Sequence, residues 1–270
     1  MDSSTDLPGT QASGSAGRPA EAKKRQRQLL LVSAFTLWVI GLIALLATAG
    51  IVHFFHPGPW PFDLQMTETL QSLHYPPWLL TIIDFPSRFN DIVPSVIALA
   101  LWFAGLLLVA WLFKRQGKSA LLWFVIALFL VGGTAFADLI VNFLIVNLVR
   151  RPRPISPLIH IYNPEPVPSF PSGHAEHTVV YYGFLLYLSF TKPVRQWRYH
   201  WFLLPLQIFA ALNILLIGYS RIEEGSHWLS DVLAGYLEGA VCLLLLIVVY
   251  RWTLQKLEQR RAKKLAEQPV

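Results

Sequence analysis

Six apolar segments along this 270-residue chain, most of them long enough to cross a lipid bilayer, constrain its fold more than any other feature. A helix needs about 20 apolar residues to span the hydrocarbon core. The segments cover residues 29–55, 92–113, 120–149, 178–190, 201–219 and 232–250. The fourth is short, so we expect its helix to extend back toward His174. The pattern predicts an all-α, polytopic membrane protein with six transmembrane helices.

The composition supports this class. Hydrophobic residues make up 54% of the chain and charged residues only 14%, whereas an ordinary soluble domain carries about 25% charged residues. A disordered chain needs low hydrophobicity, so disorder is excluded for most of the sequence. The net charge of +6 does not indicate a nucleic-acid partner, because the basic residues cluster at the termini and in short loops. The single cysteine, Cys242, excludes an intrachain disulfide.

One membrane domain, residues 29–250, is expected between two basic cytoplasmic tails. Residues 1–28 begin with a stretch rich in Ser, Gly, Ala and Pro that is typical of disorder. Residues 251–270 should form a basic helix on anionic headgroups. Residues 47–49, Ala-Thr-Ala, resemble a signal-peptide cleavage site. However, the first apolar segment is longer than the apolar region of about 7–15 residues in a signal peptide, so we expect a retained membrane span.

The basic loops orient the predicted helices. Lysine and arginine residues at 23–27, 114–118, 192–198 and 251–264 all fall on one side of the membrane. The positive-inside rule therefore places both termini in the cytoplasm, with the chain in the cell membrane. Four arginines fall on the opposite side, where this rule does not require them, and they indicate an anionic ligand. They are Arg150, Arg151, Arg153 and Arg221.

Three segments meet at that outer face by topology. They are residues 150–154 (Arg-Arg-Pro-Arg-Pro), 169–174 (Ser-Phe-Pro-Ser-Gly-His) and 220–231. The fork of an arginine matches phosphate oxygens, and a helix start near Ser172 and Gly173 would offer free N–H groups. Imidazole can attack phosphorus or carry a proton. His227 and Asp231 are spaced i, i+4, so on a helix Asp231 could hold one ring nitrogen of His227 and leave the other free.

These three segments, in this order, resemble the signature of the type 2 phosphatidic acid phosphatase superfamily, in its bacterial integral-membrane lipid phosphatase branch. The resemblance implies an active site at the extracytoplasmic interface, with no metal and no cofactor. It implies that His227 is the nucleophile and forms a phosphohistidine, and that Asp231 orients it. His174 would protonate the leaving oxygen and then activate water. Arg153 and Arg221 would clamp the phosphate, helped by Ser172 and the N–H group of Gly173.

The chain departs from the family pattern at one position. The first motif of the family begins with a lysine seven residues before its Arg-Pro, and here that position is Val146. The phosphate clamp would therefore lack one cation. Arg150 lies one helical turn after Val146, and Arg151 is its neighbour. We hypothesise that Arg150 or Arg151 supplies the missing charge.

The resemblance predicts a lipid phosphatase whose partner is a phosphorylated membrane lipid. Candidate substrates are undecaprenyl diphosphate, phosphatidylglycerophosphate and phosphatidic acid. One alternative is a phosphotransferase that passes the phosphate to an acceptor other than water. Another is a non-catalytic lipid-binding or transport protein, which the substitution at Val146 motivates.

Several other polar residues have two interpretations. Asp138 and Glu238 lie inside predicted spans, where an ionisable group is a functional candidate, but we favour a buried hydrogen bond from Glu238 to Asn142, Thr134 or a tyrosine. Glu223 and Glu224 either brace the arginines or face water. A short interfacial helix near residues 62–73 is either a roof over a lipid entrance or a connector.

Overall fold

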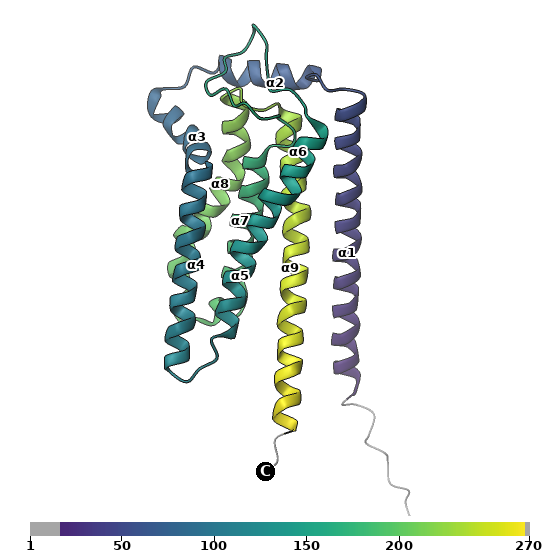
Figure 1. Ribbon diagram of the computed structural model, residues 1–270, viewed down its shortest axis with the longest axis vertical. Coiled ribbons are helices and arrows are strands. Elements are labelled where there is room, and N and C mark those ends of the chain that lie inside the picture. Colours follow the sequence, from purple (N-terminus) through teal and green to yellow (C-terminus); the bar gives the residue numbers. More distant parts are fainter. Residues whose placement is uncertain (1–16, 268–270) are drawn as a thin grey trace, which may run out of the picture. The chain divides into compact units, whose positions relative to one another are not determined.

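The computed structural model describes residues 17–267, and the described chain is all-α, as the apolar segments predict (Figure 1). Residues 1–40 and 41–270 separate into two compact units, and the candidate site described below lies in the second unit. Most of the predicted N-terminal tail, residues 1–16, lies outside the described residues. The helices are α1 (Gly17–Phe54), α2 (Pro61–Ser72), α3 (Pro77–Phe89), α4 (Ile92–Arg115), α5 (Leu121–Phe136), α6 (Phe143–Val149), α7 (Gly173–Phe190), α8 (Leu204–Glu223) and α9 (Leu229–Ala266).

Five segments of the described chain are long and apolar enough to cross a membrane. They are residues 32–54, 92–115, 121–149, 200–223 and 229–264, so the chain is a multi-pass membrane protein. The third segment combines α5, a π-helical turn (Ala137–Asn142) and α6. The expected fourth span, α7, is not among the five, and six spans are therefore not confirmed. Its first turns carry Glu176, His177 and Thr178, which are buried.

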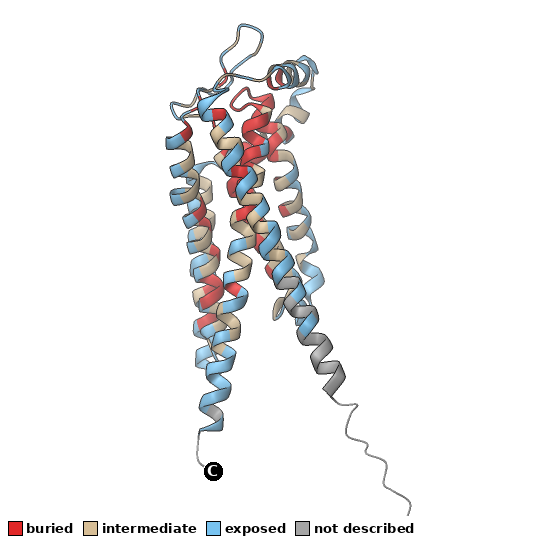
Figure 2. Cartoon of the chain, turned by 90° about the vertical axis from the view of Figure 1, so that its right-hand side faces the viewer, coloured by how far each residue is buried: buried red, intermediate tan, exposed pale blue. Residues whose placement is uncertain are grey.

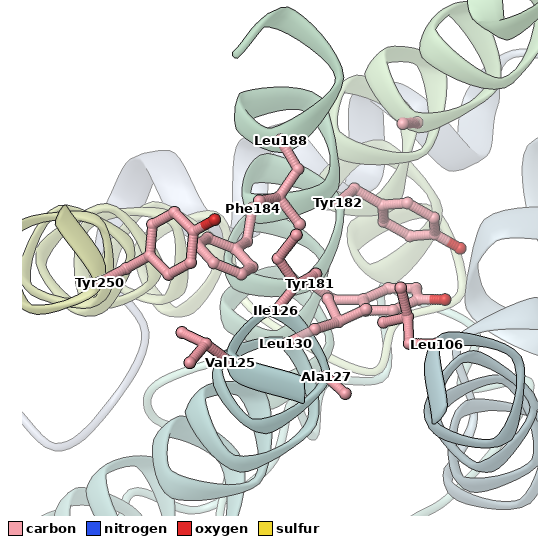
Figure 3. Close-up of a cluster of buried hydrophobic side chains, with 11 residues drawn as sticks. Leu106, Val125, Ile126, Ala127, Leu130, Tyr181, Tyr182, Phe184, Leu188 and Tyr250 are labelled. Atoms are coloured by element: carbon pink, nitrogen blue, oxygen red, sulfur yellow. The ribbon is translucent and has the colours of Figure 1, made fainter. Parts of the chain in front are cut away.

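Helix α7 packs closely against its neighbours. Its contacts with α9 and α8 are more extensive than its contacts with any other helix. A Cβ atom on Gly239 of α9 would lie 2.8 Å from the carbonyl oxygen of Glu176. The two backbones can approach because Gly239 has no side chain, as small residues allow at helix contacts in membranes. Tyr181, Tyr182 and Phe184 of α7 then fill the core between α5, α8 and α9 (Figure 3).

Short helices and loops build the end of the bundle that lies next to α2. Helix α2 confirms the helix predicted near residues 62–73, and it crosses the ends of the long helices (Figure 1). Helix α3, which the sequence did not predict, begins with Pro77 in its first turn. Proline is tolerated there because the first turn has no partner for its N–H groups. Many of the buried residues gather at this end of the bundle (Figure 2).

Candidate active site

The three predicted segments meet where helices α7 and α9 begin and helix α8 ends. Arg153 follows α6, His174 lies in the first turn of α7, and Arg221 lies in the last turn of α8. His227 precedes α9, and Asp231 lies in its first turn. Hydrogen bonds and ion pairs connect most of these residues directly or through one further side chain. The site therefore combines residues that are far apart in the sequence.

His227 is buried and held through both ring nitrogens. Its Nδ1 atom lies 2.8 Å from the carbonyl oxygen of Ser169, and its Nε2 atom lies 2.8 Å from Nη1 of Arg153. A carbonyl oxygen can only accept a hydrogen bond, so Nδ1 carries the proton and Nε2 holds a lone pair. Burial lowers the pKa of His227 well below its usual value of 6.5, and the positive charges of Arg153 and Arg221 lower it further. The neutral ring thus presents Nε2 as a potential nucleophile.

Asp231 is held differently from the expectation of a direct bond to His227. Its Oδ2 atom lies 3.9 Å from Nδ1 of His227, beyond hydrogen-bond distance, and accepts from the backbone N–H of Trp228 at 3.0 Å. Its Oδ1 atom accepts from Nη1 of Arg151 at 2.5 Å. The carbonyl of Ser169 has taken the place expected for the carboxylate. Asp231 therefore contributes negative charge near the ring while its orientation is determined by helix α9 and Arg151.

Arg151 joins the starts of two helices. Besides Asp231, its guanidinium contacts Oδ2 of Asp63 in α2 at 3.0 Å and the hydroxyl of Ser230 at 2.7 Å. Asp63 and Asp231 occupy equivalent places, since each accepts from the N–H of a tryptophan three residues earlier. All three charged side chains are fully buried. A carboxylate is stabilised at a helix N-terminus, so this arrangement anchors α2 to α9 beside the site.

Arg150 does not enter the site. It ends α6 in the left-handed conformation, with φ of 52°, and its Nε atom donates to the carbonyl oxygen of Asn147 at 2.9 Å. It is exposed. Thus neither Arg150 nor Arg151 contacts Arg153 or Arg221 in the described structure. No contact in the described structure supports the hypothesis that one of them replaces the lysine absent at Val146. The hypothesis stays a prediction.

Arg153 and Arg221 form a pair of guanidinium groups with a carboxylate between them. Nη2 of Arg153 lies 2.5 Å from Oε2 of Glu165, and Nη2 of Arg221 contacts the other oxygen of the same carboxylate. Burial raises the pKa of Glu165, but Arg221 and Arg153 lower it more, so the net shift is downward and the group is ionised at neutral pH. Glu165 therefore makes the bidentate contacts that a phosphate group would make.

His174 lies close enough to Arg221 and Glu165 for their charges to affect it. Its Nε2 atom lies 3.1 Å from Oδ1 of Asp91, at the start of α4. The hydrogen bond from His174 lowers the pKa of Asp91, although burial opposes this shift. Burial and the positive charge of Arg221 lower the pKa of His174, and Asp91 and Glu165 offset this shift only in part. The protonated ring is therefore a stronger acid than a free imidazolium and gives up its proton more readily.

The start of α7 provides further hydrogen-bond donors. The hydroxyl of Ser172 and Nε of Arg221 are both buried and have no partner in the part of the chain that the structure describes. The backbone N–H of Ser172 donates to the carbonyl oxygen of Asp231 at 3.1 Å. A Cβ atom on Gly235 of α9 would overlap the carbonyl oxygen of Ser172. Helix α9 thus packs closely against this segment, and Gly173 begins α7 directly after it.

Three of the four remaining polar candidates, Asp138, Glu224 and Glu238, have structural partners. Glu238 accepts a hydrogen bond from Asn142 at 2.9 Å, which confirms one of the three partners considered for it. His177 pairs with Asp138 at 2.8 Å. Glu224 braces Arg221 at 3.0 Å.

Sequence analysis did not single out Glu165, Asp91, Asp63 or Ser169 as parts of the site. A signal existed for Asp63, because Trp-x-x-Asp occurs both at residues 60–63 and at residues 228–231. Glu165 lies between two prolines in a loop, and Ser169 acts through its backbone, so neither has a distinctive local pattern.

Parts of the chain are similar in sequence to known proteins. The sequence model of the PAP2 superfamily matches residues 126–255. The chain is 28% identical over 162 residues to undecaprenyl-diphosphatase BcrC of Bacillus subtilis, covering 59% of this chain and 69% of that protein. It is 30% identical over 147 residues to phosphatidylglycerophosphatase B of the same organism, covering 52% of this chain and 63% of that protein.

The fold has a relative among solved structures. The crystal structure of a transmembrane PAP2-type phosphatidylglycerolphosphate phosphatase from Bacillus subtilis superimposes with a TM-score of 0.57 at 21% identity, covering 78% of this chain and 94% of that chain. At this identity the likeness concerns the fold alone. The matched segment 126–255 contains Arg153, His174, Arg221, His227 and Asp231. These residues therefore lie in the part of the chain that is similar to the PAP2 superfamily.

Proposed function

We propose that this protein is a membrane lipid phosphatase that hydrolyses a lipid phosphate through a phosphohistidine at His227. One observation carries the proposal. The neutral ring of His227 is fixed through Nδ1 by Ser169, and its Nε2 atom is directed at the guanidinium pair of Arg153 and Arg221. A nucleophile and a double cation thus lie side by side, as phosphoryl transfer requires.

In the first step the substrate phosphate displaces Glu165 and takes its contacts with Arg153 and Arg221. This movement also frees Nε2 of His227 from Arg153. Nε2 forms a bond to phosphorus while the bond from phosphorus to the leaving oxygen breaks. His174 gives its proton to that oxygen, so the dephosphorylated lipid leaves as an alcohol or as a lipid phosphate.

In the second step His174 takes a proton from water, and the resulting oxygen attacks phosphorus. The N–P bond breaks, and inorganic phosphate leaves with His227 neutral again. Throughout the reaction the two guanidinium groups stabilise the charge on the transferred group. Their charge supports a reaction that does not depend on a metal ion. Asp231 stabilises the positive charge that His227 acquires on phosphorylation.

Several observations support a lipid as the carrier of the phosphate. The site lies at the end of helices that can cross a membrane, and both curated relatives are named for lipid phosphates. Undecaprenyl diphosphate, phosphatidylglycerophosphate and phosphatidic acid are therefore the candidate substrates. The charge pattern of the loops supports a cell-membrane protein with cytoplasmic termini and an extracytoplasmic site.

The test is phosphate release by the detergent-purified protein in the presence of EDTA. We expect wild type to release phosphate, His227→Ala to lose at least about a thousandfold in rate, and Glu258→Gln, an exposed site on α9, to keep the full rate. Acid-labile phosphate trapped on wild type and absent from His227→Ala would identify the intermediate. Release that His227→Ala leaves intact would refute the mechanism. Release only with a second acceptor lipid would favour the phosphotransferase.

A further inference from the structure

We propose that a polar pocket beside Arg221 binds the leaving group of the substrate and selects a phosphate monoester on a hydroxyl-bearing headgroup over a diphosphate. This inference rests on the proposed function and names the substrate class of the same site. The pocket has a volume of about 410 Å³ and lies between α3, the start of α4, the end of α8 and the loop before α7. Its charged residues are Asp84, Arg88, Asp91, Arg221, Glu223 and Glu224.

The position of the pocket identifies it as the leaving-group side. Arg221 belongs both to its wall and to the phosphate-binding pair. Asp91 also belongs to its wall and pairs with His174. Because His174 protonates the leaving oxygen in the proposed reaction, that oxygen lies at His174, whose Nε2 atom is 3.1 Å from Asp91 in the pocket wall. The group attached to the oxygen then extends along this pocket.

The charge of the pocket is acidic. Four carboxylates face two arginines, and both arginines are already paired. Arg221 contacts Glu165 and Glu224. Arg88 lies 3.7 Å from Asp84, with 81% of its side chain exposed. A second phosphate bonded directly to the leaving oxygen, as in a diphosphate, would lie at close range to these carboxylates, where like charges repel. A headgroup glycerol places its phosphodiester several bonds farther away.

Glu223 provides an independent sign of a ligand. The residue is only 4% exposed, and its side chain lines the pocket. Its carboxylate makes no hydrogen bond or ion pair to any residue that the structure describes, although its backbone carbonyl accepts from Gln71 at 2.7 Å. A carboxylate that receives no hydrogen bond from the protein can accept one from a ligand in the pocket. Hydroxyl groups on a headgroup would satisfy it, because they donate the hydrogen bonds that a carboxylate accepts.

The experiment compares three lipids with the same dioctanoyl tail in detergent. One carries a phosphomonoester on a glycerol headgroup, one carries it directly on diacylglycerol, and one is the diphosphate of diacylglycerol. We expect kcat/KM for the glycerol-bearing monoester to exceed that for the diphosphate at least tenfold. Glu223→Gln and Asp84→Asn should each narrow this ratio, chiefly by lowering KM for the diphosphate. The exposed Glu258→Gln serves as the matched control and should leave the ratio unchanged.

The outcomes separate the two proposals. Equal use of the lipids by wild type, or a preference for the diphosphate, would overturn the selectivity while leaving the phosphatase intact. If neither Glu223→Gln nor Asp84→Asn changes the ratio of kcat/KM between the monoester and the diphosphate, the pocket is not the cause of the selectivity. Because Asp84 and Glu223 lie on different helices, one folded variant is enough for this comparison. Failure of wild type to release phosphate from any of the three lipids would refute the proposed function and this inference together.

Discussion

Replacing Glu165 with glutamine should strengthen the binding of phosphate to this protein. Glu165 bridges Arg153 and Arg221, which are the groups that the substrate phosphate has to reach. Its carboxylate is therefore a competitor carried by the chain itself. Glutamine has the same shape without the charge, so Glu165→Gln removes the competitor and leaves the arginines in place.

The magnitude follows from the contacts that are lost. A hydrogen bond to a charged group contributes about 1.5–3 kcal/mol, and the side chain of Glu165 is 26% exposed, so we take the lower end of this range. About 1.4 kcal/mol corresponds to a tenfold change in an equilibrium constant. Apparent affinity is reduced by the fraction of molecules that can bind. The dissociation constant of an anion at this pair should therefore fall about tenfold in Glu165→Gln.

Inhibition of phosphate release by orthovanadate, which resembles phosphate in charge and shape, measures this change. Calorimetric titration with inorganic phosphate provides a second measurement that does not depend on turnover. Phosphate should also raise the melting temperature of Glu165→Gln more than that of wild type, because a ligand stabilises the state that it binds. Glu165→Asp keeps the charge and should bind anions like wild type. Equal or weaker anion binding by Glu165→Gln would refute the competition between Glu165 and phosphate.

Three further predictions concern the support of the site. Gly235→Ala should lower kcat and thermal stability, because its methyl group would overlap the carbonyl of Ser172. Gly105→Ala, with nothing within 4 Å, should lower neither. Equal effects of the two substitutions in activity and melting assays would contradict this prediction. Arg151→Ala should lower the free energy of unfolding by about 3–5 kcal/mol, because it leaves buried carboxylates unpaired, and an unchanged melting temperature would exclude this role. His227 has a lowered pKa, so its contribution to stability is complete above pH 6.5 and declines as the pH falls below that value. The fall of kcat/KM on the acid side should therefore have its midpoint below pH 6.5. A midpoint above pH 6.5 would show that burial and the arginines do not lower the pKa of His227.

The apolar segments predicted the fold class because membrane solvation acts on each segment separately. A run of apolar residues must become a helix in lipid, whatever its neighbours are, since its backbone groups have to be satisfied internally. Five of the six predicted segments correspond to helices that can cross a membrane. The exception, α7, is the helix that begins at the site, where buried polar residues lower its hydropathy. Helix α9 extends beyond the apolar segment to Ala266.

The sequence alone also indicated the kind of chemistry, because arginines and histidines on the outer side have no other reason to gather there. It could not assign their partners. The i, i+4 spacing of His227 and Asp231 placed them on one face, yet only the packing of the loop before α7 brought the carbonyl of Ser169 within 2.8 Å of Nδ1. Likewise, Glu165 reaches Arg153 and Arg221 through tertiary structure. Spacing along a helix determines which residues share a face, whereas the partner of a buried charge depends on segments that fold against it from elsewhere in the chain.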